Sequence, residues 1–156
     1  MMPALPTDGT SGRQPIRLEN QLCFAIYAAS RALAGAYREL LKELDLTYPQ
    51  YIVMLALWEQ DGVTISELGR RVLLDFGTLT PLLKRLESRG LLIRRRDPKD
   101  ERNVRLTITP VGRTVQEQAS CIPAALRCQI SLTREETASL REAMKTLIND
   151  LTEWGQ

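Results

Sequence analysis

The stretch Gly77-Thr78-Leu79-Thr80-Pro81-Leu82-Leu83-Lys84-Arg85-Leu86-Glu87-Ser88-Arg89-Gly90 decides the fold of this chain. Four leucines recur in it at the spacing i, i+3, i+4 and i+7, which predicts an amphipathic helix with one buried stripe. They are Leu79, Leu82, Leu83 and Leu86. Gly90 is placed to end the helix. The opposite side carries small, hydroxyl and basic side chains, so we expect it to be exposed and available to a partner.

A shorter helix is predicted before this one. Thr64-Ile65-Ser66-Glu67 has the spacing of a capping box, so a helix should start at Thr64 and continue through Val72. The residues from Leu73 to Phe76 then form a short connection. Two helices joined in this way have a helix-turn-helix layout. Many helical hairpins share that pattern, so the sequence around it must decide the function.

The residues after Gly90 predict a β-hairpin. Alternating apolar and polar side chains favour one strand over Leu91 to Arg96 and a returning strand over Val104 to Thr109, with a turn from Asp97 to Asn103. A hairpin with a charged tip directly after such a helix is a wing, whose arginines can enter a DNA minor groove. The alternative is an ordinary edge hairpin with solvated arginines.

Charge is concentrated in the same region. Residues 84–105 contain nine basic and four acidic side chains, whereas the whole chain has a net charge of only +2. Helix, hairpin and charge together favour double-stranded DNA as the partner. The expected DNA contacts are Gly77, Thr78, Thr80, Lys84, Arg85, Ser88, Arg94, Arg95, Arg96, Lys99 and Arg102.

Further helices are predicted on both sides of this unit. Apolar periodicity favours one helix over Leu18 to Leu44 and another that begins near Tyr48. A helix should start at Thr109-Pro110 and be kinked or broken by Pro123, and a capping box at residues 133–136 should open the last helix. The central unit is too small to bury all their apolar positions, so pairing with a second chain is expected.

The sequence therefore predicts a mainly α fold with a small β-hairpin wing. We expect a winged helix-turn-helix over residues 48–109, dimerised through helices in residues 16–45 and 110–156. Residues 16–156 would form a single domain. Residues 1–15 are rich in Pro, Gly, Thr and Ser, and we expect a disordered N-terminal tail.

Three cysteines and no histidine narrow the possible chemistry. Catalytic triads with a His base are excluded, and a zinc site has too few ligands, so no metal and no cofactor is expected. The chain has no secretion signal and no long apolar run, which favours a cytoplasmic protein without membrane contact. The best candidates for reactive groups are the thiols of Cys23, Cys121 and Cys128.

Three separated motifs occur in order: Gln21-Leu22-Cys23-Phe24-Ala25-Ile26-Tyr27, Leu46-Thr47-Tyr48-Pro49-Gln50-Tyr51 and the run from Gly77 to Glu87. Together the motifs resemble those of the organic hydroperoxide resistance regulators, OhrR, of the MarR family. The resemblance covers roughly residues 18–119. It implies a homodimeric repressor of the two-cysteine type, not an enzyme, with operator DNA as its partner and organic hydroperoxides as inducers.

The resemblance also implies that Cys23 is the redox sensor, whose thiolate attacks the peroxide and becomes a sulfenic acid. Tyr27, Tyr37 and Tyr48 match tyrosines that support this thiolate. On a continuous helix Tyr37 lies about 21 Å along the axis from Cys23. A contact between these two residues would therefore have to come from the partner chain.

A second thiol would determine the fate of the oxidised sulfur. Cys128 best matches the resolving cysteine of two-cysteine members, which forms a disulfide between subunits. Cys121 has no clear counterpart. One further position departs from the family, because Phe76 stands where a small hydroxyl residue is common between Asp75 and Gly77. A helix cap or phosphate contact from that side chain is therefore in doubt.

Two alternatives stay open at this point. A MarR-like repressor could be gated by a small phenolic ligand, with Cys23 inert. A thiol peroxidase would share the first oxidation step, but it would give no role to the wing.

Overall fold

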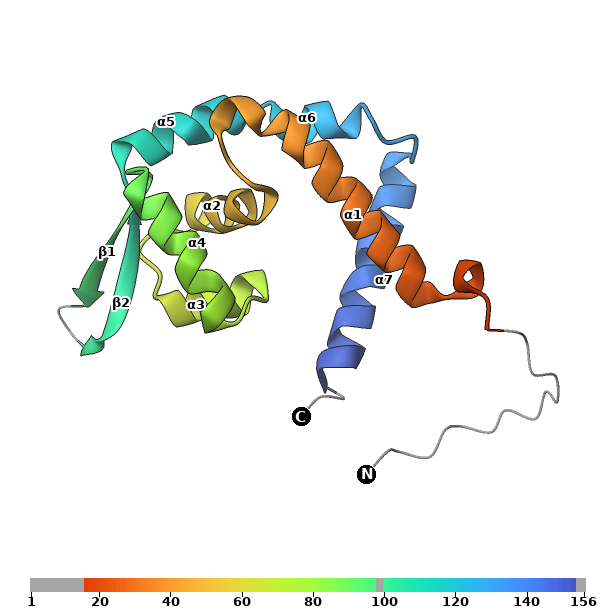
Figure 1. The fold of residues 1–156 in the computed structure, drawn as a ribbon, viewed down its shortest axis with the longest axis horizontal. Coiled ribbons are helices and arrows are strands. Elements are labelled where there is room, and N and C mark those ends of the chain that lie inside the picture. Colours follow the sequence, from red (N-terminus) through yellow and green to blue (C-terminus); the bar gives the residue numbers. More distant parts are fainter. Residues whose placement is uncertain (1–15, 98–99, 154–156) are drawn as a thin grey trace. The chain divides into compact units, whose positions relative to one another are not determined.

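The computed structural model describes residues 16–97 and 100–153. The chain divides into two compact units, residues 1–35 and residues 36–156. Most elements are α-helices, and two antiparallel strands form one hairpin (Figure 1). The predicted mainly α fold with a small hairpin is confirmed. A helix suited to cross a bilayer does not occur within the ranges that the structure describes.

The first unit contains a short 3-10 helix, η1 (Leu18–Asn20), and most of α1 (Leu22–Leu40), which runs on into the second unit. The prediction of one helix from Leu18 to Leu44 is wrong at both ends. After α1 the chain turns through a second 3-10 helix, η2 (Lys42–Leu44), and Asp45 adopts a left-handed conformation with φ of 49°. Leu41 is wholly buried at this turn. The helix therefore stops where burial of Leu41 outweighs local helix propensity.

The second unit continues with α2 (Tyr48–Glu59), α3 (Ile65–Val72), α4 (Phe76–Ser88), β1 (Leu92–Asp97), β2 (Asp100–Ile108), α5 (Pro110–Ala119), α6 (Ile122–Arg127) and α7 (Arg134–Glu153). The predicted leucine stripe of α4 is confirmed, with Leu79, Leu83 and Leu86 wholly buried and Leu82 partly buried. They share one core with α2 and with the hairpin. This core fixes α4 and leaves its other side exposed.

Hydroxyl caps set the starts of α3 and α5, as the sequence predicts. At α3 the backbone N of Glu67 donates to Thr64 Oγ1 (3.2 Å), and the backbone N of Thr64 donates to Glu67 Oε2 (2.7 Å). The backbone N of Gly112 likewise donates to Thr109 Oγ1 (3.0 Å) at the start of α5. The predicted break also occurs, because α5 ends at Ala119 and Pro123 lies in the first turn of α6.

The returning strand of the hairpin is longer than the sequence suggests, because β2 begins at Asp100 and not at Val104. Its register pairs Leu92 with Ile108, and its last pair is Asp97 with Asp100. The predicted turn from Asp97 to Asn103 is therefore wrong. Asp97 and Asp100, at the tip, are the last pair of the ladder. Asp97 is buried there and accepts a hydrogen bond from Arg105 on the opposite strand (2.6 Å). A buried carboxylate needs such a partner, and strand pairing supplies it.

Candidate DNA-binding surface and redox thiols

Helix α4 is capped by Asp75. The backbone N of Thr78 donates to Asp75 Oδ1 (2.9 Å), and the hydroxyl of Thr78 donates to Asp75 Oδ2 (2.7 Å). Both bonds hold the pKa of the Asp75 carboxyl below its ordinary value, and the bond from the Thr78 hydroxyl has the larger effect. Phe76 is therefore not needed as a cap, although it departs from the family pattern at this position.

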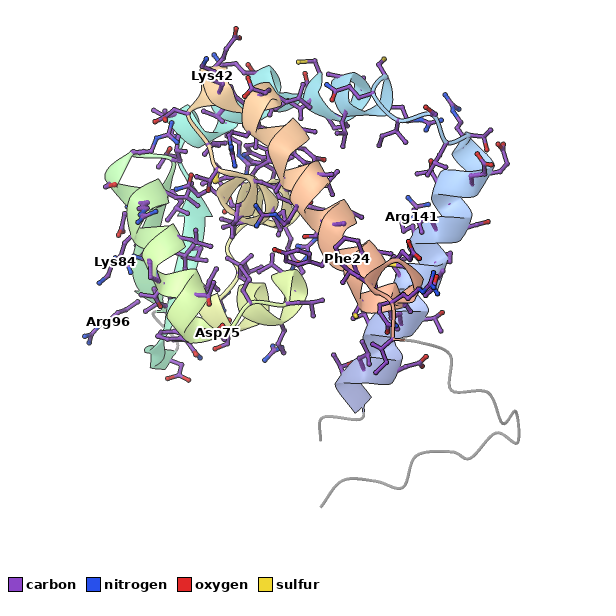
Figure 2. The ribbon with its side chains drawn as sticks, turned by 45° about the vertical axis from the view of Figure 1, so that its right-hand side comes forward. Phe24, Lys42, Asp75, Lys84, Arg96 and Arg141 are labelled. Atoms are coloured by element: carbon purple, nitrogen blue, oxygen red, sulfur yellow. The ribbon has the colours of Figure 1, made fainter. Side chains whose placement is uncertain are left out.

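The outer side of α4 is small, hydroxyl-bearing and basic, as predicted. Gly77, Thr78, Lys84, Arg85 and Ser88 are exposed, and Thr80 is partly exposed. Figure 2 shows Lys84 on α4 and Arg96 on β1 pointing away from the protein on the same side. The helix and the hairpin thus direct basic side chains to the same side of the molecule, where they can meet DNA phosphates.

The three wing arginines do not have equal roles. Arg95 and Arg96 are exposed. Arg94 instead donates from Nε to Glu87 Oε2 (2.7 Å), and its backbone N donates to Glu87 Oε1 (3.1 Å). The side-chain bond from Arg94 is the main reason that the pKa of Glu87 is lowered. Arg94 therefore ties β1 to α4, and part of its charge is neutralised within the chain.

Arg105 ties the wing to the rest of the chain, a role that sequence reasoning missed. Besides its bond to Asp97, it donates from Nη1 to the carbonyl oxygen of Gly62 (2.7 Å), in the connection between α2 and α3. The sequence did hold one signal for this role. Arg105 lies between Val104 and Leu106 in the returning strand, so its side chain points to the opposite face of the hairpin from theirs. Lys99 and the side chain of Arg102, both expected to contact DNA, lie outside the described residues.

All three cysteines are free and exposed. Cys23 lies in α1, where no residue is fully buried within the chain. Its neighbours Leu22 and Phe24 are exposed, and so is Tyr27, one turn further along. The thiol therefore lies in an apolar, accessible helix surface. Cys121 and Cys128 flank α6 at its two ends.

Two of the predicted tyrosines lie together. The rings of Tyr37 and Tyr48 stack with centroids 4.3 Å apart, and the ring of Tyr51 lies 5.5 Å from that of Tyr37. Burial, and then the neighbouring Tyr48 and Tyr51, raise the pKa of Tyr37 to about 12. Burial also raises the pKa of Tyr48. Both phenols therefore stay protonated at neutral pH and can donate hydrogen bonds.

Tyr51 is the member of this cluster that sequence reasoning did not single out, although it belongs to the motif at residues 46–51. Burial, and then Cys121 and Tyr48, raise its pKa. Tyr27 belongs to the other unit, and its hydroxyl accepts a hydrogen bond from Arg31 Nη1 (3.4 Å). Only Tyr37 and Tyr48 of the three predicted tyrosines thus lie in contact within the described structure.

Comparison with known proteins gives a consistent picture. Residues 36–119 match the family model of the transcriptional regulator SarA/Rot. The regulator TtmR of Methylorubrum extorquens is 44% identical over 142 residues, which is 91% of this chain and 73% of the relative. The organic hydroperoxide resistance transcriptional regulator of Bacillus subtilis is 42% identical over 136 residues, 87% of this chain and 92% of the relative.

Solved structures of AbfR, known from Staphylococcus epidermidis, are also similar. Reduced AbfR bound to DNA superposes with a TM-score of 0.76 at 36% identity, covering 90% of this chain and 96% of AbfR. Disulfide-formed AbfR superposes with a TM-score of 0.61 at 39% identity, covering 88% and 93%. Structures of one similar protein thus exist in a reduced state on DNA and in a disulfide state.

Proposed function

This chain belongs to the MarR-type winged-helix transcriptional regulators, in the branch of the organic hydroperoxide resistance regulators, and from that membership we propose how it is switched. It is a redox-sensing, DNA-binding repressor. In our proposal it binds operator DNA as a homodimer and releases it when an organic hydroperoxide oxidises Cys23. Cys128 of the partner subunit then forms a disulfide with Cys23.

The surface of α4 and the wing supports the DNA-binding step. In helix-turn-helix proteins the second helix enters the major groove with its N-terminal residues at the base edges. Lys84 and Arg85 would then contact phosphates, and the exposed Arg95 and Arg96 of the wing would contact the minor groove or its phosphates. Arg94 would contribute less, because Glu87 holds it.

Exposed apolar side chains outside the winged-helix core support the homodimer. On α1 they are Leu22, Phe24 and Tyr27, and on α7 they are Leu140, Ile148 and Leu151. Burial of these side chains against a second copy would stabilise the dimer by roughly 25 cal/mol for each Å² of apolar surface removed from water. A symmetric dimer would also place two α4 helices for two half-sites.

The proposed chemistry has two steps. The Cys23 thiolate attacks the terminal peroxide oxygen, the O–O bond breaks, and the alkoxide leaves as an alcohol after taking a proton. Cys23 is then a sulfenic acid. The thiolate of Cys128 attacks its sulfur, a disulfide forms, and hydroxide leaves as water after taking a proton. The protonated phenols of Tyr37 and Tyr48 support this scheme as donors to the sulfur.

The observation that carries the proposal is the exposed, free thiol of Cys23 on an apolar helix surface of a chain with a separate DNA-binding surface. The test uses the full-length reduced protein on a fluorescein-labelled duplex selected by the protein from random sequence. Addition of stoichiometric cumene hydroperoxide should release the duplex from the wild type and from Cys121→Ser. It should leave Cys23→Ser bound.

A non-reducing gel tests the second step. The oxidised wild type should run as a crosslinked dimer, and Cys128→Ser should not. Persistence of the crosslink in Cys128→Ser would reject Cys128 as the partner. Release of DNA from Cys23→Ser by peroxide would reject Cys23 as the sensor, and catalytic turnover of peroxide without any DNA binding would instead indicate a peroxidase.

A further inference from the structure

Phe76, the first residue of α4, carries a large apolar side chain that the chain does not cover. It is 66% exposed, although it lies directly after the cap of the helix. Its side chain borders a hollow between α4 and β1 that Thr80, Arg95 and Arg96 also line. The ring is therefore accessible to whatever this surface binds.

The other side chains at this end of α4 are already engaged or absent. The hydroxyl of Thr78 donates to Asp75, and the hydroxyl of Thr80 donates to the carbonyl oxygen of Phe76 (2.8 Å). Gly77 offers no side chain. Phe76 is therefore the large free side chain at the end of α4 that lies nearest the bases in a helix-turn-helix complex.

We propose that Phe76 is a specificity residue that packs on the C5 methyl group of a thymine in each half-site of the DNA. The inference rests on the proposed function. A phenyl ring has no hydrogen-bonding group, so it can distinguish bases in the major groove only by apolar contact, and thymine is the base that presents a methyl group there. Lys84 and Arg96, which point away from the protein on one side, supply the charge that holds the phosphates while the ring makes this contact (Figure 2).

The test removes the methyl group from the DNA and the ring from the protein. The full-length reduced protein is titrated by fluorescence anisotropy into the duplex that it selects from random sequence, in which single thymines are replaced by deoxyuridine. Replacement of one thymine in each half-site removes two methyl contacts and should weaken wild-type binding about 15-fold, since each buried methyl group accounts for a factor of about four. Phe76→Ser should bind more weakly and show no change on the same replacement.

Two controls separate base contact from a general loss of structure or charge. Leu73→Ser removes another exposed apolar side chain from the same turn, outside α4, and should keep the full response to deoxyuridine. Phe76→Ser should melt at the wild-type temperature and keep the wild-type salt slope, because a phenyl ring neutralises no phosphate.

The outcomes are distinct. A wild type that binds its selected duplex but responds to no deoxyuridine replacement overturns the role of Phe76, as does a Phe76→Ser variant that keeps the response. A selected sequence without thymine in the half-sites overturns it too. A wild type that selects no duplex at all would overturn the proposed function instead.

Discussion

Substitution of Gly112 by alanine should destabilise the protein, although alanine is the better helix former. Gly112 lies in the first turn of α5, where this helix contacts the end of the hairpin. A Cβ atom there would lie 2.7 Å from Ile108 Cγ2 and closer still to the carbonyl oxygen of Leu91. Neither neighbour is the end of a flexible chain, because the Leu91 oxygen accepts a hydrogen bond from the backbone N of Thr109 (3.1 Å). The clash must therefore move the backbone.

The size of the effect is set by two opposed terms. Overpacking in a rigid site costs about 3 kcal/mol at the upper end of its usual range. The change from glycine to alanine within a helix recovers about 1 kcal/mol. The net loss should be about 2 kcal/mol, which corresponds to a fall in Tm of about 4–8 °C for a chain of this length.

Thermal and urea unfolding at one fixed protein concentration measure this loss, with Glu117→Ala, an exposed position on the same helix, as the control. Trp58 gives a second readout, because its Nε1 donates to the carbonyl oxygen of Gly112 (3.0 Å). If the helix moves, Trp58→Phe should cost less in the Gly112→Ala background than in the wild type. Gly112→Ala as stable as the wild type would refute the reasoning.

Single substitutions test the caps, the tyrosines and the wing in the same way. Thr47→Ala removes the cap of α2 and should cost about 1 kcal/mol in urea unfolding, whereas Thr47→Ser should cost little. The raised pKa of Tyr37, about 12 against an ordinary 10, means that its neutral form stabilises the fold below pH 10 and that this contribution is lost as the pH rises towards 12. Urea midpoints between pH 9 and 12 should therefore fall less steeply in Tyr37→Phe, and an unchanged slope would contradict the burial of this phenol. Arg96→Ala should reduce the slope of log K against log salt by about 0.9 for each phosphate that it no longer neutralises. Arg94→Ala should reduce it less, because Glu87 already offsets that charge; equal reductions would count against this distinction.

The parts of the fold that could be predicted are those that depend on a few neighbouring residues. The cap at Thr64 needs only Glu67, three residues on, and the stripe of α4 needs only its own leucines. The break at Leu41 depends on a core built from residues far along the chain. Local periodicity does not contain that information.

The site shows the same division. Counting charges placed Arg94, Arg95 and Arg96 together, but it could not show that Glu87, on the preceding helix, lies opposite β1 and holds Arg94. The burial of Asp97 was hidden for the same reason, because it depends on the partner strand. Contacts between side chains of different helices and strands decide which of these charged residues stay free for DNA and which are held within the chain. Those contacts can be seen only in the structure.

The position of the cysteines constrains how oxidation can release DNA. In the part of the chain that the structure describes, the winged-helix core contains none of Cys23, Cys121 and Cys128, and all three are exposed. Oxidation at such sites creates no cavity and buries no polar group in the core, so we expect each α4 and wing to keep its fold. In the proposed homodimer, release would then come from a change in the spacing of the two copies, whose half-sites would lie about 34–36 Å apart. A change of about 3.4 Å, one base step, already displaces one α4 by a full base pair while the other stays seated. The dimer would then bind through one unit at a time and lose the gain in affinity that comes from joining two. A disulfide from Cys23 to Cys128 of the partner subunit fits this requirement, because it fixes the relation between copies and leaves the surface that contacts DNA chemically unchanged.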